Sequence, residues 1–298
     1  MRISNSILAA MAATLVLASC SNDENGGVEI AEYITVNTSI GSLSRTTTTN
    51  GTQSFAKDDQ ISVYAWTGSA DVVNADGMVV NNSINTYDGT KWSASPQMLW
   101  KDMMTPHYFL GVYPTRAITD FTADAYTLDV TKQEQSDLLV AVNTGTDNAG
   151  FTATNTAVPL QFDHVMAKLI VNLSFRNQWA TTPTVTSVTT GNLKGKATVN
   201  YLTKSATVTA EDATNIELPV ATANTTYQSI MVPQAGNDAT IAIKIGEKDY
   251  TYTGTVKLES GKYTTVNLIV GRDGITLGSV SINDWGEGTT INGGEAQE

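Results

Sequence analysis

The first stretch of the chain with a regular hydrophobic pattern covers residues 28–45. Its hydrophobic positions of one parity are Ile30, Ile34, Val36 and Ile40, and the positions between them are mostly polar. A repeat of two residues is typical of a β-strand that buries one face. The pattern therefore predicts a first strand over residues 28–40, which Gly41 ends.

A polar loop follows this strand and contains Arg45. Four consecutive threonines and the pair Asn50-Gly51 come next, so the segment has little to bury. An arginine in an exposed loop is a target for proteases. The residues alone leave two interpretations open: an ordinary edge strand followed by a surface loop, or a strand followed by a cleavage site.

The same alternation recurs along the rest of the chain. Further strands are predicted at residues 61–66, 107–113, 126–130, 138–142, 158–175, 185–189, 195–201, 206–210, 228–232, 239–245, 250–255, 262–270 and 280–284. A hairpin centred on Asp76-Gly77 is also predicted, together with one helical turn within residues 131–137. Short strands spaced about ten residues apart, with Gly and Asn turns between them, indicate an all-β fold of the sandwich type.

The chain has 298 residues, enough for a targeting segment and two domains of about 120 to 140 residues each. Its longest polar interval inside the folded part runs from Asn143 to Asn155. Such turn-rich segments commonly separate domains. We therefore expect an N-terminal domain over residues 55–155, completed by the strand at 28–40, and a C-terminal domain with a polar tail over residues 156–298.

The formal net charge of −12 and the sequence pI near 4.5 narrow the possible partners. A strongly acidic protein repels the phosphate backbone of nucleic acids. We therefore expect no nucleic-acid partner.

The N-terminus predicts export from the cytoplasm. Arg2 supplies a positive charge, and residues 7–17 form a mostly apolar run. As a helix this run spans about 16 Å, which is too short to cross a hydrocarbon core of about 30 Å. Residues 1–19 are therefore predicted to be a signal peptide.

The signal peptide ends in Leu17-Ala18-Ser19-Cys20, which resembles the lipobox of bacterial lipoproteins, where the cysteine becomes the acylated first residue of the mature chain. Cys20 is the sole cysteine, so it cannot form an internal disulfide. Several acyl chains anchor a protein stably to a membrane. The acidic residues 21–27 resemble the surface-export signal of lipoproteins in some Gram-negative anaerobes. Residues 20–54 are therefore predicted to contain a lipidated tether, the first strand and the loop with Arg45, in a protein displayed on the outer-membrane surface.

The sequence contains no recognisable motif for catalysis, for a cofactor or for a metal ion. His107 and His164 are its only histidines, whereas zinc sites need three or four ligands. Asp58 and Asp59 are better explained by a solvated turn, because adjacent strand residues point to opposite faces. Nucleotide-binding loops, nucleophile elbows and EF-hand spacings are missing as well. We therefore expect a protein that is not an enzyme, although a glycosidase built from two distant carboxylates stays open.

Aromatic residues leave a glycan-binding surface lipoprotein as an alternative function. Five tryptophans and eleven tyrosines are present, and flat aromatic faces stack well on sugar rings. Trp92, Trp100 and Trp285 are found at predicted strand ends and turns, however. Burial in sandwich cores is the simpler expectation for these three side chains.

A series of short motifs together resembles the fimbrillin family, the subunits of pili on Gram-negative anaerobes of gut and mouth. The motifs are FAKDDQISVYA at 55–65, YDGTKW at 87–92, FLGVYP at 109–114, DLLVA at 137–141, LQFDHVMAKL at 160–169, LESGKY at 258–263 and INDW at 282–285. No single motif is specific, but their order and spacing together are.

The resemblance implies two tandem transthyretin-like β-sandwich domains in a lipoprotein that an arginine-specific protease cuts. In that family the cut removes the lipid-bearing first strand, and a strand from a neighbouring subunit fills the vacated groove. Arg45 matches the cleavage position, because it follows the first strand and precedes the motif that begins at Phe55. An open sheet edge suits such strand addition. The implied partners are other fimbrial subunits, the outer membrane through the lipid on Cys20, and the protease.

The donor strand of the family comes from the C-terminal region, where the fit is less clean. Residues 286–298 are too polar to fill a long groove. Residues 275–283 could fill it if they detached, and their hydrophobic parity switches at Gly278, as at a β-bulge. The position of the subunit along the fibre therefore stays open, and a subunit that keeps its lipid would be an uncut pilus anchor.

Overall fold

The computed structural model describes residues 33–41, 54–209 and 214–285. The regular secondary structure of this part is almost entirely β-strand, with one short helix, α1 (Gln133–Ser136), and 3₁₀ turns at Ala75–Gly77 and Thr146–Asn148. The strands are β1 (Val36–Ile40), β2 (Gln60–Thr67), β3 (Met78–Tyr87), β4 (Trp92–Ser95), β5 (His107–Tyr113), β6 (Asp124–Thr127), β7 (Leu139–Asn143), β8 (Val158–His164), β9 (Ala167–Phe175), β10 (Val185–Leu193), β11 (Lys196–Asn200), β12 (Ser205–Val208), β13 (Thr214–Glu217), β14 (Val220–Thr222), β15 (Thr226–Met231), β16 (Ala239–Ile245), β17 (Lys248–Gly254), β18 (Lys262–Val270) and β19 (Ile275–Asp284). The predicted all-β class is confirmed.

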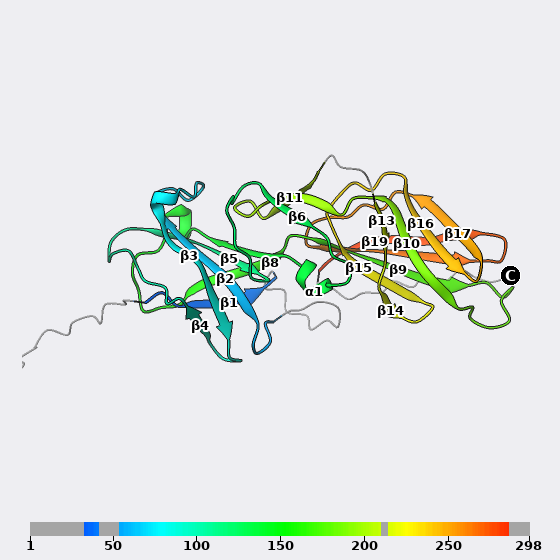
Figure 1. Cartoon of the computed structure of the whole chain (residues 1–298), viewed down its shortest axis with the longest axis horizontal. Helices are drawn as coiled ribbons and strands as arrows, with labels where there is room; N and C mark the ends of the chain where they lie inside the picture. The colour runs from blue at the N-terminus through cyan, green and yellow to red at the C-terminus, as the bar shows by residue number, and fades with distance from the viewer. Residues whose placement is uncertain (1–32, 42–53, 210–213, 286–298) are drawn as a thin grey trace, which may run out of the picture.

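These strands form four sheets along an elongated molecule (Figure 1). A seven-stranded sheet has the order β1-β8-β7-β5-β2-β3-β4, and a three-stranded sheet has the order β12-β11-β6. A five-stranded sheet, β14-β15-β9-β18-β19, and a four-stranded sheet, β13-β10-β16-β17, complete the described part. Most neighbouring strands are antiparallel, whereas β1 runs parallel to β8 and β9 runs parallel to β18.

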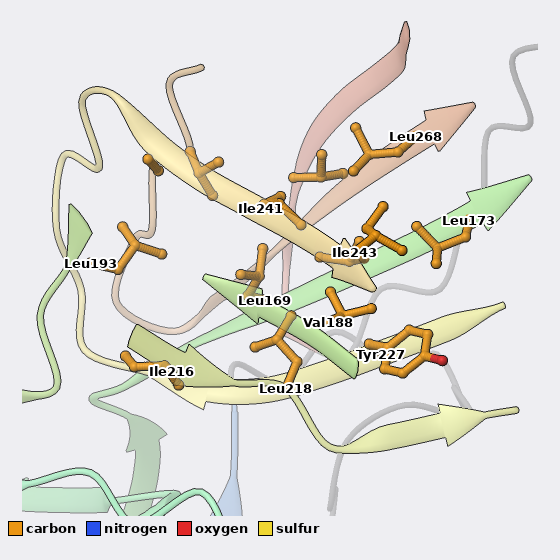
Figure 2. Packing of buried hydrophobic residues seen from close by; sticks show 14 of the residues in the cluster. Leu169, Leu173, Val188, Leu193, Ile216, Leu218, Tyr227, Ile241, Ile243 and Leu268 are labelled. Atoms are coloured by element: carbon orange, nitrogen blue, oxygen red, sulfur yellow. The ribbon is translucent and has the colours of Figure 1, made fainter. Parts of the chain in front are cut away.

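The C-terminal core fills the space between the five-stranded and four-stranded sheets (Figure 2). Leu169 and Leu173 point into it from β9, and Ile241 and Ile243 point into it from β16. Along β9 the buried residues alternate with partly exposed ones, as the sequence pattern predicts. The two sheets therefore form a β-sandwich.

The middle core lies on one face of the seven-stranded sheet. Tyr64 of β2 and Leu110 of β5 are fully buried there, and Val199 of the three-stranded sheet packs in the same cluster. Ile230 of β15 also belongs to it, so the five-stranded sheet contributes to this core as well. The two ends of the molecule therefore share a hydrophobic core.

The N-terminal core lies on the opposite face of the seven-stranded sheet. Ile61 and Val63 of β2, Phe109 of β5 and Phe162 of β8 are each fully buried in it. Because this sheet has a core on each face, β2 is buried along nearly its whole length. The continuous hydrophobic character of β2 follows from this double burial.

The chain passes from the seven-stranded sheet to the five-stranded sheet about ten residues after the domain boundary expected between residues 155 and 156. β8 follows that boundary in sequence, yet it pairs with β1 and β7 in the seven-stranded sheet. The chain leaves this sheet at Val165 and Met166, which are both fully buried, and enters the five-stranded sheet as β9. The alternating stretch at 158–175 is thus two strands in different sheets.

Two local predictions have different outcomes. The helical turn within residues 131–137 is confirmed as α1. The hairpin centred on Asp76-Gly77 is wrong in its first arm, because β2 is the strand that pairs with β3. A Cβ atom on Gly77 would lie 2.5 Å from the carbonyl oxygen of Thr67. The glycine therefore permits a close approach of two backbone segments.

Candidate functional site: the first strand and its groove

β1 forms one edge of the seven-stranded sheet within the described residues. Its register with β8 runs from Val36 opposite Val158 to Ile40 opposite Phe162. The amide of Val158 donates a hydrogen bond of 2.8 Å to the carbonyl of Thr35, and the amide of Gly41 donates one of 2.8 Å to the carbonyl of Phe162. The strand is therefore held along its length by backbone bonds to β8.

The hydrophobic side chains of β1 point into the N-terminal core. Ile34 is 1% exposed and Val36 is 6% exposed, and Ile40 packs against the same cluster while partly exposed. Asn37 and Ser39, which have the other parity, are exposed. The structure thus places three of the four residues predicted for the hydrophobic face of the first strand against the same core. Ile30 lies outside the described residues.

The residues just before β1 also contact the opposite edge of the curled sheet. The amide of Ile34 donates a hydrogen bond of 2.9 Å to the carbonyl of Met98, and Tyr33 forms a β-bridge with Leu99. Further along, the indole Nε1 of Trp92 on β4 donates to the hydroxyl of Thr38 over 2.9 Å. Because β4 is the other edge strand, β1 closes the sheet around the N-terminal core.

The described residues on the two sides of the gap at 42–53 both contact Phe162 of β8. Gly41 is bonded to the carbonyl of Phe162, and the ring of Phe55 packs edge-on against that of Phe162 at 5.2 Å. Phe55 also contacts Trp92 at 5.1 Å and Tyr113 at 5.5 Å. Arg45 itself, like Cys20, lies outside the described residues. Gly41 and Phe55, which flank the undescribed residues 42–53, therefore both lie at Phe162.

β19 is the edge strand at the far side of the five-stranded sheet and includes the whole donor segment predicted at residues 275–283. It pairs antiparallel with β18, and Leu277 and Val280 are 40% and 39% exposed. The register shifts between Asn267 and Leu268 of β18, opposite Gly278, so the predicted bulge is confirmed. β19 is therefore a long strand with few deeply buried side chains.

The polar residues considered in the sequence are dispersed. His107 and His164 are both buried, in different parts of the molecule. Among the described residues, no three His, Cys, Asp or Glu side chains are placed to hold a metal ion. The same part of the chain contains no helix long and apolar enough to cross a membrane. Trp100 is buried, as expected, and Trp92 and Trp285 are partly exposed but pack against the N-terminal core and the middle core, respectively.

Comparison with known proteins gives the family. A family model described as fimbrillin-like matches residues 44–285. The chain belongs to the fimbrillin-like family. No curated protein sequence matches it significantly.

Solved structures show the same fold as this fimbrillin-like chain. A candidate cell adhesion protein from Bacteroides ovatus is 19% identical with a TM-score of 0.67, covering 86% of this chain and 98% of its own. A candidate cell adhesion protein from Bacteroides uniformis is 18% identical with a TM-score of 0.65, covering 85% and 99%. A fimbrial protein from Bacteroides vulgatus is 15% identical with a TM-score of 0.54, covering 84% and 99%. At these identities the likeness concerns the fold.

Proposed function

We propose that the chain is a structural subunit of a surface fimbria that contributes to cell adhesion. It is exported by the signal peptide at residues 1–19 and acylated at Cys20, which tethers it to the outer membrane. Membership of the fimbrillin-like family supports the fimbrial role. The names of the similar structures, which are fimbrial or candidate cell adhesion proteins, agree with it.

Polymerisation is proposed to occur by strand exchange after an arginine-specific protease cuts at Arg45. The observation that carries this proposal is the position of β1. It is an edge strand that fills the N-terminal core with Ile34 and Val36, and the loop with Arg45 follows it directly. Once the loop is cut, backbone bonds and apolar contacts alone retain the strand.

Departure of β1 would leave a groove suited to an incoming strand. The peptide edge of β8 would lose its partner over residues 158–162, and the N-terminal core would lose the cover of Ile34. Unpaired backbone groups beside an apolar slot favour β-strand addition. The strand of a neighbouring subunit therefore needs hydrophobic side chains at every second position.

β19 supports one candidate for the donor. Its hydrophobic residues are only half buried, so its detachment would cost less than that of a core strand such as β9. Release of β19 would still break its full register with β18. The polar residues 286–298 are the other candidate, and the choice between them is part of the proposal.

Electron microscopy of cells that express the chain tests the fimbrial role. We expect fimbriae on cells with the natural sequence and none that contain the subunit on cells with Arg45→Lys. This substitution keeps the positive charge but removes the site for an arginine-specific protease. Undiminished incorporation of the Arg45→Lys chain would contradict the polymerisation mechanism. Acylated Cys20 in purified fimbriae would instead favour an uncut anchor subunit.

A further inference from the structure

A pocket with a volume of about 700 Å³ lies at the junction of the seven-stranded and five-stranded sheets. We call it the junction pocket. Its walls include Tyr113 of β5, Lys168 of β9, Gln228 of β15 and Glu134 of α1. Ligand sites typically have volumes of about 300 to 1,000 Å³, with apolar surfaces and a few convergent polar groups. The junction pocket has this size and this mixture.

An aromatic platform forms one part of the pocket. The ring of Trp285 lines it and stacks on the ring of His164, with centroids 4.1 Å apart and planes at 14°. The amide of Trp285 donates a hydrogen bond of 3.0 Å to the carbonyl of Gly261. The indole is therefore supported on one face by His164, and it stays partly exposed in the pocket wall.

Polar groups around the platform are held in place by the fold. The side-chain oxygen of Gln133 accepts a hydrogen bond of 2.7 Å from the amide of Ile230, and its Nε2 donates to the hydroxyl of Ser229 over 3.1 Å. These bonds fasten α1 to β15 and so position the exposed Glu134 at the pocket. Asp137 pairs with Nδ1 of His164 at 2.8 Å, behind the platform. The side chains of Gln133 and Asp137 are therefore held in fixed positions at the pocket.

The hydroxyl of Tyr113 adds a hydrogen-bond donor. Burial raises the pKa of Tyr113 to about 12, so the phenol stays protonated at neutral pH. Its oxygen lies 3.5 Å from the carboxylate of Asp59, which also lines the pocket. A phenol beside a carboxylate offers both a donor and an acceptor to a ligand hydroxyl group.

The charge of the lining selects among ligands. Asp59, Glu134 and Asp137 carry three negative charges against one positive charge on Lys168, a balance of −2. Sialylated, sulfated or phosphorylated ligands would be repelled by this balance. An uncharged ligand rich in hydroxyl groups, with a flat C–H face for the indole, fits the remaining chemistry.

We propose that the junction pocket binds an uncharged oligosaccharide of two or three sugar units. Trp285 stacks on one sugar ring, while Glu134, Gln228 and Tyr113 contact its hydroxyl groups. The inference rests on the proposed function in one respect: adhesion would be the biological use of the binding. Binding is tested on the uncut, monomeric chain, because Ile40 of β1 and Trp285 after β19 both line the pocket. A failure to bind is therefore distinguishable from a failure of cleavage at Arg45 or of fibre assembly.

Calorimetry on the full mature chain tests the proposal. The probes are lactose, maltose, cellobiose and N,N′-diacetylchitobiose, with 3′-sialyllactose as the charged comparison. We expect at least one neutral disaccharide to bind with a Kd below about 10 mM, a common range for a single weak site. The sialylated sugar should bind at least about tenfold more weakly than lactose if lactose is the ligand.

Two variants locate the binding in the junction pocket. Trp285→Ala should weaken binding at least about tenfold, and Glu134→Gln should weaken it several-fold. Glu134 is exposed, so Glu134→Gln leaves the fold intact even if Trp285→Ala loosens the packing at His164. Glu247→Gln, at an exposed turn between β16 and β17, is the matched control and should bind like the natural chain. Absence of binding by all four neutral sugars, or binding that both pocket variants leave unchanged, would overturn the proposal.

Discussion

Gly111 shows how one small residue shapes the groove under β1. It lies on β5, and a Cβ atom there would be 2.6 Å from Cζ of Phe162 and 3.1 Å from Cδ1 of Leu160. Both neighbours are on β8, the strand that pairs with β1. The glycine within the FLGVYP motif therefore lets two large side chains of β8 lie flat against the centre of the sheet.

Replacement of this glycine should destabilise the N-terminal core. Gly111→Ala forces Phe162 or Leu160 to move within a packed interior, and overpacking of this kind costs about 1 to 3 kcal/mol. Gly274→Ala is the control, because nothing lies within 4 Å of a Cβ built there, and it should change the free energy of unfolding by less than about 0.5 kcal/mol. Urea unfolding of both variants measures the difference. Equal stabilities would show that β8 does not pack as described.

His107 makes the folding stability of the chain depend on pH. Its side chain is fully buried, its Nε2 accepts a hydrogen bond of 3.0 Å from the amide of Lys101, and the ring packs edge-on against Trp100 at 5.0 Å. Burial lowers the pKa of His107 in the folded chain. The unfolded chain then binds more protons below pH 6.5, so this contribution to stability is present at pH 7 and declines as the pH falls.

Acidification should therefore destabilise the natural chain more than a variant without this imidazole. Between pH 7 and pH 5, His107 contributes a loss of at most about 1.4 kcal/mol per pH unit below 6.5. His107→Gln cannot ionise, and its unfolding midpoint should depend less on pH over this interval. Thermal unfolding of both chains at the two pH values gives the comparison. An identical pH dependence would rule out His107 as the group responsible.

Among the secondary-structure elements, β1 is short, yet the side chain of Val36 at its start is buried. Val36→Asn would place an amide in the N-terminal core, where a buried polar group without a partner costs about 2 to 3 kcal/mol. Thr35→Asn makes the same side chain at an exposed neighbour and should change stability by less than about 0.5 kcal/mol. Denaturant unfolding of the uncut chains measures both effects. Similar losses in the two variants would mean that parity along β1 does not determine its packing.

The hydrophobic pattern predicted the elements better than it predicted their partners. The parity of Ile34, Val36 and Ile40 is visible in the sequence, because burial alternates with residue number along any half-buried strand. The parallel pairing with β8 and the contacts with Met98 and Leu99 are not visible. These depend on segments distant in sequence, and only the folded sheet brings them beside β1.

The junction between β8 and β9 illustrates the same limit. Residues 158–175 alternate almost without interruption, and neither glycine nor a polar turn marks the change of sheet at Val165 and Met166. Both residues are fully buried because the middle core surrounds the crossing. The chain therefore changes sheets after β8, whereas the composition places a boundary at the polar loop before it. The sequence does not reveal the junction pocket for a related reason. Its lining residues come from segments throughout the chain, and only the fold brings them together.

At the scale of the whole molecule, the middle core joins the two ends. β6 pairs with β11, although about 70 residues separate them, and Lys204 forms an ion pair with Asp163 across the same region. By contrast, β1 contributes to the N-terminal core alone. Loss of β1 would thus open one end of the molecule while the middle and C-terminal cores remain closed. This arrangement suits a subunit that must stay folded while it exchanges one strand.

The central claim is that β1 leaves the subunit once the chain is cut at Arg45. Cleavage of the purified mature chain tests this claim most directly. After treatment with an arginine-specific protease, mass spectrometry identifies the cut and size-exclusion chromatography follows assembly. We predict a cut after Arg45, release of the peptide that contains β1, and oligomers held together without covalent bonds, while Arg45→Lys stays monomeric. A chain that is cut at Arg45 yet keeps the β1 peptide and remains monomeric, or an Arg45→Lys chain that assembles equally well, would contradict the account.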